Sequence, residues 1–155
     1  MFTTDKLYII EYNMRPGDPE GQILSSHLDC DFLSLLYDIA LGKNKIISIK
    51  YKKNTTACIA IANVNYLNNT YLLEGEIQNQ TTSIINLEKI KDNINIFLDS
   101  SISYKDNSNT IFTDEPKRII NLCTTSHNPF EDIYNQLNSI NAENIYYRTD
   151  IKAKI

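Results

Sequence analysis

In the first part of the chain, the hydrophobic positions first follow the period of a strand and then, after a loop, the period of a helix. Apolar residues at Leu7 and Ile9 alternate with others over residues 6–13, which predicts a strand. Residues 15–21 combine Arg, Pro, Gly, Asp and Glu, and this composition is the strongest loop signal in the chain. A helix is expected next, because apolar residues then recur every three or four positions. Asp29 or Asp31 can cap it and Gly42 can end it. Its apolar stripe consists of Phe32, Leu35, Leu36 and Ile39.

The middle of the chain follows a period of two, broken by polar turns. Such runs, at hairpin spacing, favour a small barrel or a strongly curved sheet. The expected strands cover residues 46–53, 57–67, 70–78, 83–87 and 94–98.

The last third predicts one more helix between two strands. After a polar loop over residues 99–109, a strand is expected over residues 117–123 and another over 144–155. Between them, Asn128 can cap a helix whose first position is Pro129. The apolar stripe of this helix consists of Phe130, Ile133, Tyr134, Leu137 and Ile140.

Together these patterns predict an α+β fold. We expect a small antiparallel SH3/Sm-like curved sheet or barrel, flanked by two helices, with an extra C-terminal helix-strand unit. Residues 1–155 are expected to form a single domain, with a barrel core over 33–98 and a C-terminal extension over 99–155 packed on it. The residues expected in the core are Phe32, Leu36, Ile39, Ile49, Tyr71, Ile133 and Leu137.

Composition adds limits on the class of protein. With 155 residues, of which 42% are hydrophobic and 22% charged, the chain has the composition of an ordinary globular domain. Cys30, Cys58 and Cys123 lie far apart and form no CxxC pair, which favours reduced thiols in the cytoplasm. No signal-peptide pattern and no apolar stretch of about 20 residues are present, so we expect no membrane association.

The net charge of −4 is distributed unevenly. Residues 1–42 hold two basic and seven acidic residues, whereas residues 43–56 hold five lysines and no acid. These lysines are a candidate site for a polyanion such as single-stranded nucleic acid, with Lys50 and Lys52 on one strand face and Tyr51 in the core. The alternative is a solvated edge strand, where lysines discourage pairing with other chains. The lysines are Lys43, Lys45, Lys50, Lys52 and Lys53.

Residues 33–97 resemble the WYL domain family. The resemblance rests on four segments in the order of that family: Leu36–Ala40, Ile46–Tyr51, Thr70–Leu72 and Leu87–Ile90. It implies an SH3-like or Sm-like barrel that senses nucleic acid or a nucleotide-type ligand, usually in a regulator of transcription or in a defence system. Thr70 stands where the family has Trp, and no helix-turn-helix is predicted before the barrel.

Few other residues suggest a catalytic or metal-binding site. The segment from His27 to Asp31 holds potential metal ligands, but its spacing fits no structural zinc pattern, so we expect no metal. Cys123 and His127 lack a recognisable orienting acid, and ordinary capping of the helix after Asn128 accounts for this segment. No P-loop, Rossmann fingerprint, HExxH or GxSxG pattern occurs. We therefore expect a protein that is not an enzyme and needs no cofactor.

Two functions remain from the sequence. The first is a non-catalytic regulatory protein whose WYL-like barrel binds single-stranded nucleic acid or a nucleotide. The second is a phage or mobile-element protein that binds another protein, as an inhibitor of a bacterial defence system or as an immunity protein. The abundance of Ile, Asn, Lys and Tyr, whose codons are AT-rich, is compatible with both.

Overall fold

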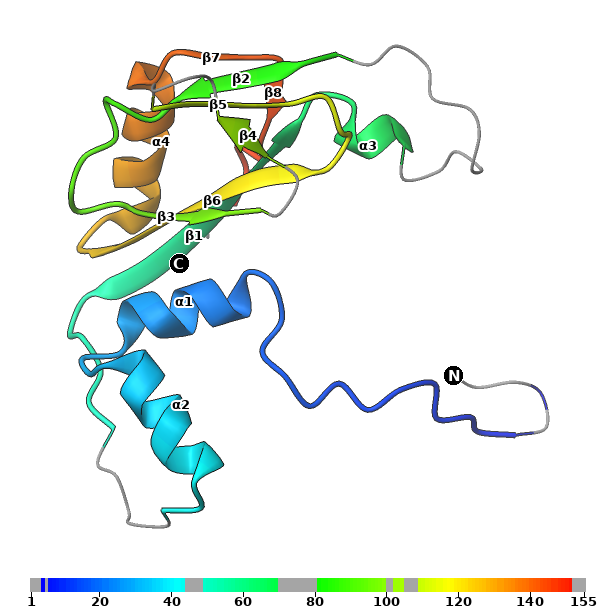
Figure 1. Cartoon of the computed structure of the whole chain (residues 1–155), viewed down its shortest axis with the longest axis vertical. Helices are drawn as coiled ribbons and strands as arrows, with labels where there is room; N and C mark the ends of the chain where they lie inside the picture. Colours follow the sequence, from blue (N-terminus) through cyan, green and yellow to red (C-terminus); the bar gives the residue numbers. More distant parts are fainter. Residues whose placement is uncertain are drawn as a thin grey trace.

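The computed structural model describes residue 4 and residues 6–43, 49–69, 81–99, 102–104 and 109–151. Figure 1 shows an extended N-terminal arm that leads into the early helices, followed by two sheets that lie together with the later helices beside them. The early helices are α1 (Glu20–His27) and α2 (Phe32–Ala40); the later ones are the short α3 (Tyr66–Asn69) and α4 (Pro129–Ser139). None of the described helices is long and apolar enough to cross a membrane.

Strands from distant parts of the chain form two antiparallel sheets. The larger sheet has the order β3-β6-β1-β8, and the smaller one has the order β4-β5-β2-β7. The longest pairing joins β1 to β6, from Thr55 opposite Ser126 to Ala62 opposite Arg118, with a register shift after Ile61. The strands are β1 (Thr55–Asn63), β2 (Ser83–Asn86), β3 (Asn95–Leu98), β4 (Ser103–Tyr104), β5 (Thr110–Thr113), β6 (Arg118–Ser126), β7 (Ala142–Glu143) and β8 (Ile145–Tyr146).

The hydrophobic core lies where the two sheets and α4 meet. The larger sheet contributes Ile59 and Leu122, the smaller sheet contributes Ile85 and Ile111, and α4 contributes Ile133. All five side chains are fully buried. Along β1 every second residue, Ala57, Ile59 and Ile61, belongs to this core, because strand side chains alternate between faces.

Buried polar side chains connect the loops to this core. Gln136 of α4 accepts a hydrogen bond from the backbone N–H of Lys91 at 3.1 Å and donates one to the carbonyl of Lys89 at 2.9 Å. Asn63, at the end of β1, donates to the Thr81 carbonyl and to Ser83 Oγ, at 2.7 and 2.9 Å. Each buried amide therefore satisfies backbone groups that the sheets leave unpaired.

Helix α1 covers the other face of the larger sheet. His27 Nδ1 lies 2.9 Å from Thr56 Oγ1, and the hydroxyls of Thr56 and Thr125 are 2.7 Å apart. At the same face, Asn95 Nδ2 donates to Ser26 Oγ at 3.2 Å. The larger sheet is thus enclosed on both faces, by α1 on one side and by the core on the other.

The predicted α+β class with antiparallel strands is confirmed, but the SH3/Sm-like barrel is not. Within the described residues the strands form two sheets and no closed barrel. None of the described strands of residues 33–98 pairs with another strand of that range; β1, β2 and β3 all pair with strands from residues 103–146. The predicted strand over 70–78 lies outside the described residues, and the division into a barrel core and an extension stays a prediction.

The predicted core is right for α4 and wrong for α2. Ile133 and Leu137 are buried, and Tyr71 lies outside the described residues. Leu36, Ile39 and Ile49 are exposed, and Phe32 is only half-buried. The reason is that α2 lies away from both sheets and none of its residues is buried (Figure 1).

Candidate functional site: the Asp18 junction

The loop predicted over residues 15–21 forms a junction between the N-terminal arm and the larger sheet. Residues 15–19 run without regular structure into α1, which begins at Glu20 after a cis peptide bond between Asp18 and Pro19. Pro16 and Pro19 carry no backbone N–H, so neither can extend a regular hydrogen-bonded element through the loop. Side-chain contacts instead hold the loop in place.

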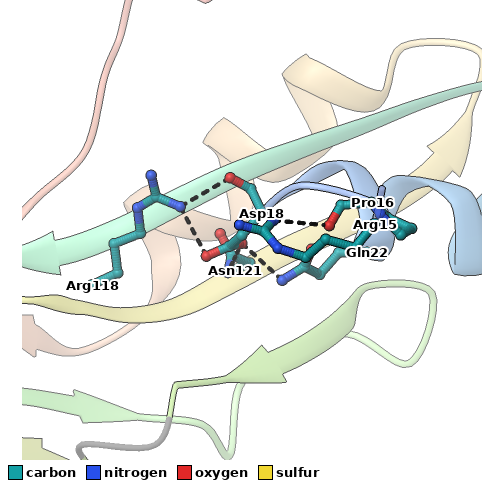
Figure 2. Close-up of polar contacts among 6 residues, drawn as sticks. All are labelled: Arg15, Pro16, Asp18, Gln22, Arg118 and Asn121. Atoms are coloured by element: carbon teal, nitrogen blue, oxygen red, sulfur yellow. Dashed lines mark hydrogen bonds and ion pairs between the residues drawn. The ribbon is translucent and has the colours of Figure 1, made fainter. Parts of the chain in front are cut away.

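Asp18 is the centre of these contacts (Figure 2). Arg118 Nη1, from the start of β6, donates to Asp18 Oδ2 at 2.9 Å and to the Asp18 carbonyl at 3.1 Å. Gln22, on the first turn of α1, donates to Asp18 Oδ1 at 2.8 Å. One carboxylate therefore joins the loop, α1 and the larger sheet.

Arg118 remains charged at this junction. Partial burial by itself would lower the pKa of Arg118, but hydrogen bonding with the side chain of Tyr66 and the charge of Asp18 outweigh burial and raise that pKa above its usual range. The ion pair with Asp18 is thus present at any pH at which the carboxyl is ionised.

Asn121 supplies a second polar group below the loop. It lies on β6 with only 5% of its surface exposed, and its Nδ2 is 3.4 Å from Asp18 Oδ1. Its Oδ1 is buried and has no hydrogen-bond partner among the described residues. A buried carbonyl oxygen of this kind can accept a hydrogen bond from a donor that enters the junction.

Arg15 presents a cation at the entrance of the same loop. Its side chain is exposed, and its Nη1 donates to the neighbouring Pro16 carbonyl at 3.2 Å. A guanidinium has five N–H donors, so most of this group can bind an anion from solution. The Asp18 junction therefore combines an exposed cation, a fixed ion pair and a buried acceptor.

An open groove of about 700 Å³ lies beside the junction. The loop and α1 form its polar side through Pro16, Gly21, Gln22 and Ser25. Its apolar side comes from α2 and β3, through Phe32, Leu36, Ile96, Phe97 and Leu98. Pockets for ligands or partner chains commonly have this mixture of apolar walls and a few polar groups.

The structure places four of the five lysines of the predicted polyanion site, which stays a prediction. Lys43 forms an ion pair with Asp38 at 2.7 Å, and Lys52 Nζ donates to the Ser26 carbonyl at 2.7 Å. Lys50 and Lys53 are exposed, and Lys45 lies outside the described residues.

The prediction that Tyr51 points into the core is wrong. Its side chain is 56% exposed, and its ring lies 5.6 Å from that of His27. Residues 49–53 are not a strand of either sheet: Leu28 and Tyr51 form an isolated bridge, and the backbone N–H groups of Asp29 and Lys52 bond across it.

The other candidate segments are structural. Asp31 caps α2, accepting hydrogen bonds from the N–H groups of Leu33 and Ser34 at 3.0 and 3.1 Å. Among the described residues, no group of three His, Cys, Asp or Glu side chains could hold a metal ion. Cys123 is buried opposite Cys58 on the neighbouring strand, whereas His127 is exposed after the end of β6.

Curated ligases match this chain over nearly its whole length. A protein named phosphoribosylamine–glycine ligase from Caldanaerobacter subterraneus subsp. tengcongensis is 28% identical over 99% of this chain and 34% of its own length. Ligases of the same name from Fusobacterium nucleatum and Listeria innocua are each 25% identical, over 97% and 99% of this chain and 34% of their own lengths. The chain thus spans about a third of the length of the relatives it matches.

These relatives correct the function expected from the sequence. No protein-family model matches the chain, so that comparison neither supports nor contradicts the WYL resemblance. The relatives are named as an enzyme, which contradicts the prediction of a non-catalytic regulator and that of a phage, defence or immunity protein. Sequence reasoning treated the Arg15–Gly21 segment only as a loop, although its paired charges and prolines were the one local signal of the junction.

Proposed function

We propose that this chain acts in a reaction that joins phosphoribosylamine to glycine, as the counterpart of one third of a phosphoribosylamine–glycine ligase. The observation that carries the proposal is the similarity along 97–99% of the chain to ligases of that name from three bacteria. Because the match covers only about a third of each relative, we propose that the complete reaction also uses the part that corresponds to the other two thirds.

The Asp18 junction is the part of the chain best suited to a role in this reaction. Phosphoribosylamine carries a phosphate, and arginine binds phosphate through paired N–H groups at a fixed angle. Arg15 is exposed, and the contacts of Asp18 with Arg118 and Gln22 hold the loop that carries it. We propose that Arg15 binds the phosphate and that the junction keeps it in position.

A chimaera tests both parts of the proposal. The matched third of the Caldanaerobacter ligase is replaced by this chain, and labelled glycine is followed into a phosphate-bearing product, with a nucleoside triphosphate as energy source. We expect glycine incorporation that depends on phosphoribosylamine. Arg15→Ala should raise KM for phosphoribosylamine at least about tenfold, because a charged hydrogen bond is worth about 1.5–3 kcal/mol. Arg15→Lys should recover part of this loss.

Lys89→Ala is the matched control, because Lys89 is an exposed cation on the loop between β2 and β3. It should leave KM for phosphoribosylamine unchanged. A folded chimaera without activity would contradict the proposed function. An active chimaera in which Arg15→Ala and Lys89→Ala behave alike would contradict only the role of Arg15.

A further inference from the structure

Helix α2 has the composition of a core helix but the exposure of a surface helix. Its nine residues, Phe-Leu-Ser-Leu-Leu-Tyr-Asp-Ile-Ala, are mostly apolar, and none of them is buried. Leu33 is 76% exposed, Tyr37 63% and Ile39 60%. The helix is nevertheless well defined at both ends, by the Asp31 cap and by Gly42 at a φ of +64°.

The apolar surface continues beyond α2. Phe32 and Leu36 face the groove of about 700 Å³ whose other walls are α1 and β3, and Leu98 of β3 is 47% exposed at its edge. Figure 1 shows the N-terminal arm and α2 on the side of α1 that faces away from the two sheets. We call the surface formed by α2 and the groove the α2 face.

An uncovered apolar surface of this kind indicates an interface. Proteins that act alone rarely expose a contiguous apolar patch larger than a few hundred Å². The relatives indicate an occupant, because the match to this chain covers only about a third of their length. The groove is also continuous with the junction, since Pro16 and Gly21 line it.

We propose that the α2 face binds the polypeptide that corresponds to the unmatched two thirds of the ligase; this inference rests on the proposed function. The partner surface is expected to be apolar where it meets Leu33, Leu36 and Tyr37, which are exposed on α2. Binding there brings the partner beside Arg15.

Thiol labelling in the chimaera tests this interface without depending on activity. In a Cys30→Ser background, which removes the exposed native thiol, Leu33→Cys and Tyr37→Cys are made in the isolated chain and in the chimaera. Phe112→Cys on β5 is the control, because Phe112 is 38% exposed on the smaller sheet. Labelling at positions 33 and 37 should be at least about tenfold slower in the chimaera than in the isolated chain, as for groups that react only after local opening. Labelling at position 112 should change less than about twofold.

Equal labelling of positions 33 and 37 in the chain and in a folded chimaera would overturn the proposal. Protection already present in the isolated chain, and lost on dilution, would identify a second copy as the occupant and would also overturn it. Activity of the chimaera is read separately. If the chimaera is active but positions 33 and 37 label as fast as in the isolated chain, the interface alone is refuted. If these positions label slowly but the chimaera is inactive, the proposed function alone is refuted.

Co-expression provides a second measurement if the chimaera does not fold. The tagged chain is co-expressed with the unmatched two thirds of the Caldanaerobacter ligase, and the captured material is analysed. The wild-type chain should retain the ligase fragment, Phe112→Asp should retain it as well, and Leu33→Asp with Tyr37→Asp should lose it. A soluble fragment that the wild-type chain does not retain would overturn the proposal.

Discussion

Asp18 and Arg118 are 100 positions apart in the sequence, and their side chains form an ion pair at 2.9 Å that joins the N-terminal loop to the larger sheet. Both side chains are partly exposed, at 48% and 33%, so solvent screens much of their attraction. Asp18→Ala should lower the free energy of unfolding by about 0.5–1.5 kcal/mol, because the hydrogen bonds that Gln22 and Arg118 donate to the carboxylate are lost together. Urea denaturation at neutral pH measures this loss.

Asp150→Ala is the control for that experiment. Asp150 also pairs with an arginine, but Arg148 is only two positions away and the pair is more exposed. Loss of this ion pair should lower the free energy of unfolding only slightly, because the pair joins no segments that are distant in the sequence. Equal effects of the two substitutions would show that Asp18 does not hold the junction.

The two apolar helices should respond differently to truncation. Leu137→Ala in α4 should lower the free energy of unfolding by about 2–5 kcal/mol, because Leu137 is buried in the core. Leu36→Ala in α2 should cost less than about 1 kcal/mol in the isolated chain, because Leu36 is 46% exposed. Thermal or urea denaturation compares them, and a large loss at Leu36 would mean that α2 is covered in solution.

The three cysteines should differ in reactivity. Cys30 is exposed, whereas Cys58 and Cys123 are buried opposite each other on β1 and β6. Hydrogen bonding with Cys123, reinforced by burial, raises the pKa of the Cys58 thiol, so Cys58 is a poor nucleophile at neutral pH. A thiol reagent should modify one residue quickly, and peptide mapping should identify it as Cys30. Rapid modification of Cys58 in the folded protein would contradict the packing of α1 on the sheet.

The cap of α2 should make this helix sensitive to acid. Hydrogen bonds from the backbone and side chain of Ser34 lower the pKa of Asp31 below its ordinary value. A lowered folded-state pKa means that the carboxylate stabilises the helix above the unfolded-state pKa, and that this contribution is lost as the pH falls through the folded-state pKa.

The variant Asp31→Asn separates this effect from other titrations. Asparagine can still cap a helix but carries no charge. The stability difference between wild type and variant should be constant near neutral pH and should shrink below about pH 4, as the carboxyl becomes protonated. Denaturation of both proteins across this pH range measures the difference, and a difference that grows with acid would contradict the role of the carboxylate.

Local patterns in the sequence predict α2 and α4 but neither α1 nor α3, and they predict the sheets poorly. The cap and stop of α2, at Asp31 and Gly42, and the start of α4 at Pro129 each depend on a few adjacent residues. The partner of a strand depends on residues far away, so the alternation of β1 predicts a strand without indicating that β6 lies beside it. The apolar pattern of α2 predicts a buried face, but no residue of α2 is buried in the structure.

The candidate site was missed for the same physical reason. Asp18, Arg118 and Asn121 come together only when β6 lies beside α1, and no spacing within the sequence records that contact. The prediction of a non-catalytic protein relied on the lack of local catalytic motifs, which does not exclude an enzyme whose groups come from separate segments. The correction came from similarity along the whole chain rather than from any motif.

The pairing of β1 with β6 also constrains how the protein emerges from the ribosome. Thr56 and Thr125, which face each other across these strands, are 69 positions apart, so β1 is synthesised well before its partner. During that interval an apolar strand containing Ile59 and Ile61 has unpaired edges, which favours association with other nascent chains. Closing so long a loop is slow compared with forming α1 or α2. Emergence of β6 from the ribosome is therefore the step that protects β1, and a pause before it would prolong the exposure of the unpaired strand.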